Sequence, residues 1–516
     1  MVGLLAVSCE SSKEQSLATV LPIHDEITID EIQKAYSTEA YSIKALTQFY
    51  LDRIENLNFN GPKLNAIITL NPDVLKIATQ LDDEMQNGRI RGPLHGIPVL
   101  LKDNIDTGDK MPCTAGAIPM KDSYPLQDSP LAAQLREAGA VILGKANLSE
   151  WANFHSSYSS SGWSGLGGQT KNPYDVTRNP CGSSSGSGVA VAANLCVVAI
   201  GTETNGSIVC PSNNNGIVGI KPTVGLISRR GIIPISFSQD TGGPMARTVK
   251  DAAISLGTLT AIDTLDGATL SPGRIAYKDY TQFLNADGIK GKIIGYWKSP
   301  LGNHMRMTKV MEEAVSYFKS QGATIVELDS IMDSNAVEFS RTVMYFEFKD
   351  GLNTYLKGLG TQRTAKDLED LIKKTFSDSI EMQYFDRQRM ITAQSKESLD
   401  SEEYQDALKF MHQMAREEGI DKIMDENHLD AIIAPTGGPA WKTDLINGDN
   451  FGIFSSSPAA ISGYPNITVP MGNLDGLPVG LSIFGRAWSE PILLEIAYSY
   501  EQGTRKRFTP KYLNAE

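Results

Sequence analysis

GIPVLLK, residues 96–102, is the stretch that decides the fold. Its apolar residues do not alternate with polar ones, which is typical of a strand buried on both faces of a sheet. The strand brings Lys102 and Asp103 to its carboxyl end. A helical pattern over about residues 129–138 and a second apolar strand over residues 140–143 follow it. A strand, a helix and a strand in succession predict an α/β layer structure.

Elements of the same kind recur toward both ends of the chain. Helical periodicity covers residues 28–56, where Ser42 caps the second of two runs, and a third helix follows Asn71 and Pro72. Toward the other end, strand patterns and a final helix return over residues 431–433, 467–469, 479–483 and 490–502. Core segments at both ends predict one interleaved domain.

The domain limits follow from these patterns. We expect a single domain over residues 28–516, with its core in residues 70–330 and 429–510. Between the two core parts, about residues 333–428 are mostly helical and charged, with amphipathic spacing at 367–374 and 402–424. This segment is predicted to be a helical insertion beside the substrate cleft.

Composition and charge exclude several classes of function. The chain has 516 residues, of which 41% are hydrophobic and 21% charged, so it can bury a large core. Its 47 Lys and Arg residues against 60 Asp and Glu residues give a net charge of -13 without a long basic run. That balance opposes binding to a nucleic-acid backbone. No stretch reaches the roughly 18 to 20 apolar residues of a membrane span.

Two interpretations of the N-terminal residues 1–27 stay open. Residues 3–9 are a short apolar run that ends in Cys9 and then turns polar. This resembles the end of a bacterial lipoprotein signal, in which Cys9 would carry a lipid anchor, and predicts a periplasmic or cell-envelope location. The basic region that begins such a signal is missing. The alternative is an apolar N-terminus on a cytoplasmic protein.

The cysteines and histidines form no recognisable site. The five cysteines are too few and too irregular for a disulfide scaffold, and none forms a Cys-x-x-Cys pair with histidines at ligand spacing. We therefore expect no metal and no cofactor. The six histidines show no pattern, and His95, which precedes the 96–102 strand, is expected to serve the turn there.

Two loops rich in serine and glycine, residues 156–162 and 182–188, are candidates for an active site. Apolar segments at residues 190–200 and 217–220 lie near them in the sequence, so both loops are expected to lie against a core rather than to be linkers. GSSSG, residues 182–186, formally matches a nucleophile elbow with Ser184 at its centre. The elbow needs a strand directly before it, whereas residues 171–180 are rich in turn formers. A phosphate loop is excluded because no Gly-Lys-Ser/Thr follows.

Several segments together resemble the amidase-signature family of serine hydrolases. The first three are GIPVLLKDN (residues 96–104), GSSSGS (182–187) and GTETNGSI (201–208). The resemblance covers nearly the whole chain, from about residue 28 to 510, because it continues through residues 219–225, 240–247, 463–470 and 476–481. Within the family, bacterial peptide amidases look most similar, through residues 160–164 and 231–240.

The resemblance implies a fold and a set of roles. The fold would be an α/β/α sandwich around a large mixed sheet. Ser207 would be the nucleophile and Lys102 the base. Ser183 would be the bridging serine, because the family places that residue 24 positions before the nucleophile. The family also implies a cis peptide between Gly182 and Ser183.

Physical arguments support the same residues. A lysine with an ordinary pKa is useless as a base at neutral pH, but burial beside the 97–101 strand disfavours its charge and lowers that pKa. The backbone N–H groups of residues 204–207 are candidates for an oxyanion hole, contributed by Thr204, Asn205, Gly206 and Ser207. Two further residues, Ser184 and Asp240, are expected to support the site or to bind substrate.

Three positions near the nucleophile depart from the family pattern. Many members carry an arginine two or three residues after the nucleophile, where this chain has Val209 and Cys210. The site is therefore expected to be less cationic. Glu203 replaces a family aspartate and is expected to be a scaffold carboxylate. Cys210 has no histidine or charge partner to form a thiolate, so we expect it to serve packing.

The resemblance implies that the chain is an amidohydrolase that forms an acyl-enzyme on Ser207. The C-terminal amide of peptides is one predicted substrate. The alternatives are the glutamine-hydrolysing catalytic component of a tRNA-dependent amidotransferase and a non-catalytic binding lipoprotein. The sequence does not indicate an oligomeric state.

Overall fold

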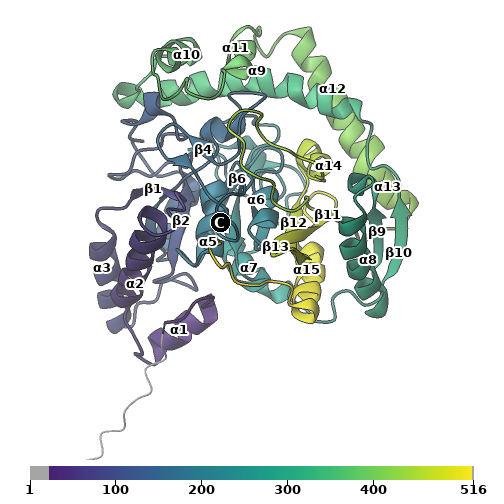
Figure 1. Ribbon diagram of the computed structural model, residues 1–516, viewed down its shortest axis with the longest axis horizontal. Coiled ribbons are helices and arrows are strands. Elements are labelled where there is room, and N and C mark those ends of the chain that lie inside the picture. Colours follow the sequence, from purple (N-terminus) through teal and green to yellow (C-terminus); the bar gives the residue numbers. More distant parts are fainter. Residues whose placement is uncertain (1–22, 514–516) are drawn as a thin grey trace, which may run out of the picture.

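The computed structural model describes residues 23–513, and its centre is one mixed sheet. Within those residues the sheet has 11 strands (Figure 1). In spatial order they are β1 (Ile67–Leu70), β3 (Val141–Ala146), β2 (Pro98–Lys102), β6 (Val198–Glu203), β8 (Thr241–Ala246), β7 (Val218–Lys221), β12 (Asn466–Leu474), β13 (Leu477–Phe484), β11 (Ala431–Pro435), β9 (Ile293–Trp297) and β10 (Thr324–Leu328). Strands from both ends of the chain thus share one sheet.

The pairing directions explain how residues far apart in sequence meet. β2 is parallel to β3 on one side and to β6 on the other, with Leu101 opposite Ile200. The carboxyl ends of parallel strands lie at the same edge of a sheet. Lys102, the last residue of β2, therefore lies beside the end of β6, from which the loop to Ser207 departs. The buried strand predicted at residues 96–102 is confirmed, since every residue of β2 is buried.

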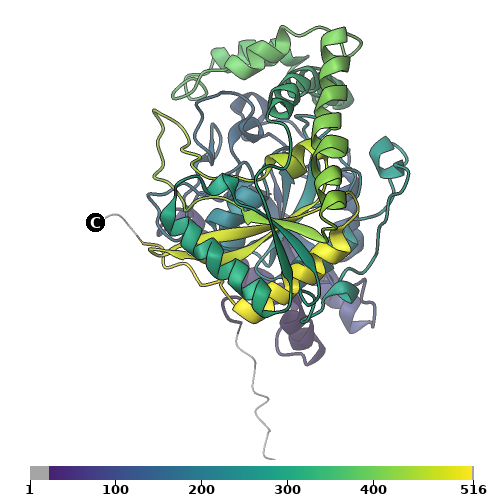
Figure 2. The same ribbon diagram turned by 90° about the vertical axis from the view of Figure 1, so that its right-hand side faces the viewer.

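Helices cover the sheet on both sides, which confirms the predicted α/β/α sandwich (Figures 1 and 2). Outside the helical segment described below, they are α1 (Ile29–Ser37), α2 (Ile43–Ile54), α3 (Val74–Gln86), α4 (Pro130–Glu137), α5 (Ser185–Ala192), α6 (Val209–Asn214), α7 (Val249–Thr258), α8 (Met305–Ser320), α14 (Ser457–Ser462) and α15 (Glu490–Thr504). Side chains cap several of them: Ser42 accepts from Ala45 N–H at the start of α2, as predicted, and Ser129 does the same for Ala132 in α4.

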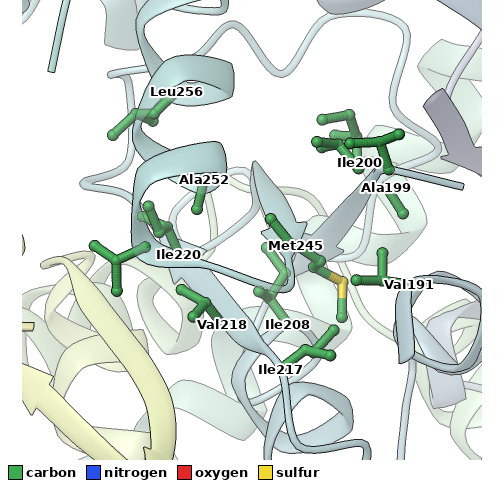
Figure 3. Packing of buried hydrophobic residues seen from close by; sticks show 14 of the residues in the cluster. Val191, Ala199, Ile200, Ile208, Ile217, Val218, Ile220, Met245, Ala252 and Leu256 are labelled. Atoms are coloured by element: carbon green, nitrogen blue, oxygen red, sulfur yellow. The ribbon is translucent and has the colours of Figure 1, made fainter. Parts of the chain in front are cut away.

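The core is continuous from the sheet into these helices. Figure 3 shows one part of it, where side chains of β6, β7 and β8 lie between Val191 of α5 and Leu256 of α7. Met245 of β8 and Ile220 of β7 are fully buried there. Burial of such side chains contributes roughly 25 cal/mol per Å² of apolar surface and holds the central strands, and with them the loops at their ends, in fixed positions.

A helical segment lies between β10 and β11 and arches over one end of the sheet (Figure 1). It contains α9 (Asn335–Gly358), α10 (Leu368–Phe376), α11 (Gln388–Gln394), α12 (Glu402–Ala415) and α13 (Asp421–Glu426). The amphipathic pattern of residues 402–424 is not one helix, because the backbone turns out of helical geometry at Gly419. A glycine tolerates that conformation without a steric penalty.

A second, smaller sheet lies in the chain before the serine-rich residues 182–188. A two-stranded ribbon of β4 (Trp163–Ser164) and β5 (Gly168–Gln169) precedes residues 182–188, which we call the serine loop. Residues 170–184 form no strand, so the structure gives GSSSG no nucleophile elbow. Cys9 lies outside the described residues. No helix within residues 23–513 is long and apolar enough to cross a membrane.

Candidate active site

Lys102 is completely buried at the end of β2 and points at a serine. Its Nζ lies 2.8 Å from Ser183 Oγ, 2.8 Å from Thr202 Oγ1 and 3.2 Å from the Thr202 carbonyl oxygen. Burial lowers the pKa of Lys102 to about 7, against smaller raising effects of the Asp240 and Glu203 charges. A substantial fraction of Lys102 is therefore a neutral amine near neutral pH, in which form it has a lone pair to offer Ser183.

The serine loop is fixed by contacts on both sides of Ser183. The peptide bond between Gly182 and Ser183 is cis, as the family resemblance implies. The Ser183 carbonyl oxygen accepts a hydrogen bond from Ser149 N–H at 3.0 Å. The neighbouring Ser184 hydroxyl donates to the Thr202 carbonyl oxygen at 3.0 Å and accepts from Thr202 N–H at 3.2 Å. Both serine side chains therefore bond to β2 or β6, and only Ser183 contacts Lys102.

The loop after β6 presents Ser207 beside the serine loop. Ser184 N–H donates to the Ser207 carbonyl oxygen at 3.1 Å. Glu203 Oε2 accepts from the N–H groups of Ile208 at 2.7 Å and Val209 at 3.0 Å, which is the scaffold role expected of this carboxylate. The two contacts hold the segment that follows Ser207 against the end of β6.

Several backbone N–H groups of the loop that carries Ser207 have no hydrogen-bond acceptor among residues 23–513. Gly206 has a φ of +85°, a conformation that favours glycine, and a Cβ there would lie 3.0 Å from Ser456 Oγ. Within residues 23–513, no oxygen accepts a hydrogen bond from the N–H groups of Asn205, Gly206 or Ser207. The Ser207 side chain also has no hydrogen-bond partner in that part of the chain, although the residue is only 8% exposed. Free backbone donors next to a free hydroxyl can bind the oxyanion of an acyl-transfer intermediate.

Asp240 anchors the same loop from the opposite side. Its Oδ1 accepts from Thr204 Oγ1 at 2.5 Å, and its Oδ2 accepts from the N–H groups of Ile235 and Ser236 at 2.8 and 2.9 Å. Burial raises the pKa of Asp240 to about 6. Both oxygens are occupied by the protein, so the geometry favours support of the loop over direct binding of substrate.

A cavity of about 740 Å³ shares Asp240 with this site. It lies between the loop of residues 229–240 and α9, and its lining combines the apolar Ile232, Pro234 and Phe237 with Tyr355. That volume is in the range of cavities that bind drug-sized ligands.

Among residues 23–513 no group of three or more His, Cys, Asp and Glu side chains is arranged to hold a metal ion.

The comparison with known families decides the family of this chain. The Amidase family profile matches residues 45–494, most of the chain. The chain belongs to the amidase signature family. It is accordingly an amidase, a hydrolase that acts on amide bonds, and the non-catalytic alternative is excluded. A probable amidase, At4g34880 of Arabidopsis thaliana, is 38% identical over 520 residues, covering 99% of this chain and 96% of the relative.

Two further relatives represent different branches. The crystal structure of native peptide amidase from Stenotrophomonas maltophilia has 47% sequence identity and a TM-score of 0.91 with this amidase, and the match covers 95% of this chain and 99% of that one. A glutamyl-tRNA(Gln) amidotransferase subunit from Thermoanaerobacter pseudethanolicus is 32% identical over 498 residues, which cover 94% of this chain and 98% of the relative.

The structure corrects the expectation for Cys210. We expected it to serve packing, but it forms a disulfide with Cys181, 29 residues earlier in the chain. The spacing carries no signal, because the two residues meet only once the serine loop and the start of α6 lie side by side. The other cysteines in the described residues, Cys113 and Cys196, are free and buried.

Sequence analysis also missed residues that support the amidase site. Thr202 contacts both Lys102 and Ser184; it lies in the family-like segment 201–208, but the sequence assigned it no role. Glu347 of α9 is fully buried and accepts from the hydroxyls of Ser236, at 2.5 Å, and Tyr404, at 2.8 Å. It thereby joins the helical segment to the loop that ends in Asp240. Nothing in the sequence pairs residues 347 and 236.

His95 and His155 make other contacts than those of the site. His95 Nε2 lies 3.1 Å from the Leu81 carbonyl oxygen, which fits the structural role expected of it. His155 is buried, its Nδ1 lies 2.8 Å from the Glu150 carbonyl oxygen, and burial lowers its pKa to about 3. Neither histidine forms a hydrogen bond with a serine of the site among the described residues.

Proposed function

We propose that this amidase hydrolyses the C-terminal carboxamide of peptides through an acyl-enzyme on Ser207, with Ser183 as proton bridge and Lys102 as base. One observation carries the proposal: a buried lysine whose pKa is lowered to about 7 lies 2.8 Å from Ser183 Oγ, and Ser183 stands in the loop that contacts Ser207. No histidine is required in this scheme.

The proposed proton path follows the contacts of Lys102. Thr202 supplies a hydroxyl and a carbonyl oxygen to Lys102 Nζ, so the lone pair of the neutral amine is left for Ser183. As Ser207 Oγ attacks the carbonyl carbon, its proton passes to Ser183 while the Ser183 proton passes to Lys102. The N–H groups of the 205–207 segment bind the oxyanion.

The leaving group takes the proton back along the same path. Collapse of the tetrahedral intermediate breaks the carbon–nitrogen bond, and the proton held on Lys102 reaches the nitrogen through Ser183, so ammonia departs. Water then attacks the ester on Ser207 with the same base and releases the carboxylate. The balance is one amide and one water to one carboxylate and one ammonium ion.

Peptide amides are proposed on the strength of similarity and space. The Stenotrophomonas maltophilia structure, a peptide amidase, matches over nearly its whole length at 47% identity. The cavity next to Asp240 has the volume for part of a peptide and an apolar wall to receive its side chains. Glutamine hydrolysis is the second candidate, favoured by the 32% identity to the glutamyl-tRNA(Gln) amidotransferase relative.

A substrate panel distinguishes the two candidates. We expect ammonia release from C-terminally amidated dipeptides and tripeptides, with kcat/KM at least about tenfold above that for free glutamine, because the cavity binds groups that glutamine lacks. The matched control is each peptide as its free acid, which has no carboxamide to lose. If glutamine proves the better substrate, the peptide-amide proposal is wrong and the glutaminase candidate replaces it.

The lipid anchor at Cys9 stays a proposal. If residues 1–27 include a lipoprotein signal, the protein isolated from its native host will partition into detergent, and its N-terminal peptide will begin at Cys9 with added acyl mass. Cys9→Ser, expressed in the same host, is the control and should remain in the aqueous phase. Recovery of an unmodified N-terminal peptide that still contains residues 1–8 would rule the anchor out.

A further inference from the structure

The disulfide between Cys181 and Cys210 connects the two loops that carry the reacting serines. Cys181 lies two residues before Ser183, and Cys210 lies three residues after Ser207. The first loop enters α5 and the second enters α6, and these helices lie beside each other at the centre of the fold (Figure 1). The covalent bond therefore closes a ring that contains both serines.

Both loops are held to β6, but few direct contacts join the loop of Ser207 to the loop of Ser183. One backbone hydrogen bond, from Ser184 N–H to the Ser207 carbonyl oxygen at 3.1 Å, joins the two loops at the serines themselves. The remaining bonds between them lie at the far end of α6, where the side-chain amides of Asn214 and Asn215 donate to the carbonyl oxygens of Asn179 and Pro180 at 3.3 and 3.0 Å. The disulfide lies between these two sets of contacts.

We propose that the Cys181–Cys210 disulfide is a positioning element of the amidase, which holds Ser207 at proton-transfer distance from Ser183 and must be oxidised for full turnover. This inference rests on the proposed roles of the two serines. Proton transfer requires heavy atoms about 2.6 to 3.2 Å apart, and a displacement of about 1 Å can cost about a hundredfold in rate. A cross-link one helical turn from Ser207 restricts displacements of that size.

The disulfide can be opened in the folded protein. Cys181 is buried, but Cys210 is partly exposed, so a dithiol reductant can attack its sulfur. The reductant gives two electrons and two protons, the sulfur–sulfur bond becomes two thiols, and the dithiol becomes a cyclic disulfide. Cys113 and Cys196 are free thiols and hold no bond that a dithiol can reduce. Burial also raises the pKa of Cys196 to about 12 and that of Cys113 well above its usual range, so neither forms a thiolate that could exchange with the disulfide.

The test compares oxidised and reduced amidase with a serine-directed fluorophosphonate and with the best amide of the substrate panel. Peptide mapping after alkylation reports the state of Cys181 and Cys210, and circular dichroism with a thermal scan reports the fold. We expect reduction to lower kcat and the rate of phosphonylation of Ser207 by about tenfold to a hundredfold, with KM within about twofold. Reoxidation should restore both rates.

Two variants separate positioning from loss of fold. The double variant Cys181→Ser/Cys210→Ser should show the same decrease in kcat and should not respond to the dithiol. Cys196→Ser makes the same atom change at a buried free cysteine and should keep both the wild-type kcat and its sensitivity to the dithiol. The unfolding midpoint of each variant must stay above the assay temperature.

The outcomes decide between the two proposals. If Ser207 is labelled in the oxidised protein and at the same rate in the fully reduced folded protein, the disulfide has no positioning role. A loss of activity that occurs only together with unfolding also overturns that role, because it makes the disulfide a general stabiliser. If the oxidised protein is labelled elsewhere and not at Ser207, the proposed catalytic function itself fails.

Discussion

Ser207→Ala is expected to lower amide hydrolysis by about 10⁴-fold or more while the protein stays folded. The substitution removes the oxygen that is proposed to form the acyl-enzyme. It removes no observed hydrogen bond, because the Ser207 hydroxyl has no partner within residues 23–513 and only the backbone of Ser207 contacts the serine loop. Ammonia release from an amidated peptide measures the rate, and a thermal scan measures the fold.

Ser184→Ala is the matched control for Ser207→Ala. It removes a hydroxyl from the same Gly/Ser environment, together with two hydrogen bonds to Thr202 at 3.0 and 3.2 Å. We expect a partial loss of activity, since Ser184 supports the loop without contacting Lys102. Full activity in Ser207→Ala, or a dead Ser184→Ala beside an active Ser207→Ala, would move the nucleophile to another serine.

Lys102→Arg is expected to be nearly as inactive as Lys102→Ala, with losses between about 10² and 10⁴-fold. A guanidinium stays protonated at every accessible pH, so it cannot accept the proton of Ser183. If Lys102 only placed a positive charge near the cleft, Lys102→Arg would retain substantial turnover. The measurement is kcat/KM of each variant at a fixed pH above about 8, where the wild-type amine is neutral.

The Lys102 amine also sets the expected pH dependence of amide hydrolysis. The active form of Lys102 is the neutral amine, and burial lowers its pKa from 10.5 to about 7. Activity should therefore fall as the pH decreases through about 7 and level off above it. His155→Gln and His95→Gln should keep that acid limb, because the two imidazoles bond to the carbonyl oxygens of Glu150 and Leu81. A histidine variant that loses activity and the acid limb would overturn the role of Lys102.

Some strands of the sheet were predictable from the sequence and others were not. β2 was predicted because its residues are all buried and therefore all apolar up to Lys102. β1, β9 and β10 toward the edges of the sheet were not predicted, and neither were β6, β7 and β8 in its middle. The residues of β10 are mostly exposed or half-buried, so its sequence shows neither a continuous apolar run nor a regular alternation.

In the candidate site, residues that stand in a recognisable short segment were predicted, whereas contacts between segments far apart in the sequence were not. Lys102, Ser183 and Ser207 could be proposed because each stands in a short segment with a family pattern. Glu347 could not, since it stands in no such segment and only the packing of α9 brings its partner Ser236 near. Thr202 stands in the same segment as Ser207, but its role depends on Lys102 and Ser184, which only the packed sheet brings near. The Cys181–Cys210 disulfide was missed for the same reason: its two halves belong to loops that the fold, not the sequence spacing, brings together.

Trapping of the covalent intermediate tests the central claim most directly. Wild-type amidase is mixed with an amidated peptide, quenched in acid before the first turnover is complete, digested and mapped by mass spectrometry. We expect the mass of the acyl group on the peptide that contains Ser207, and no such mass in Ser207→Ala. Acyl mass on Ser183, Ser184 or any other residue, or turnover without a trapped acyl group on Ser207 under conditions where it accumulates in a burst, would contradict it.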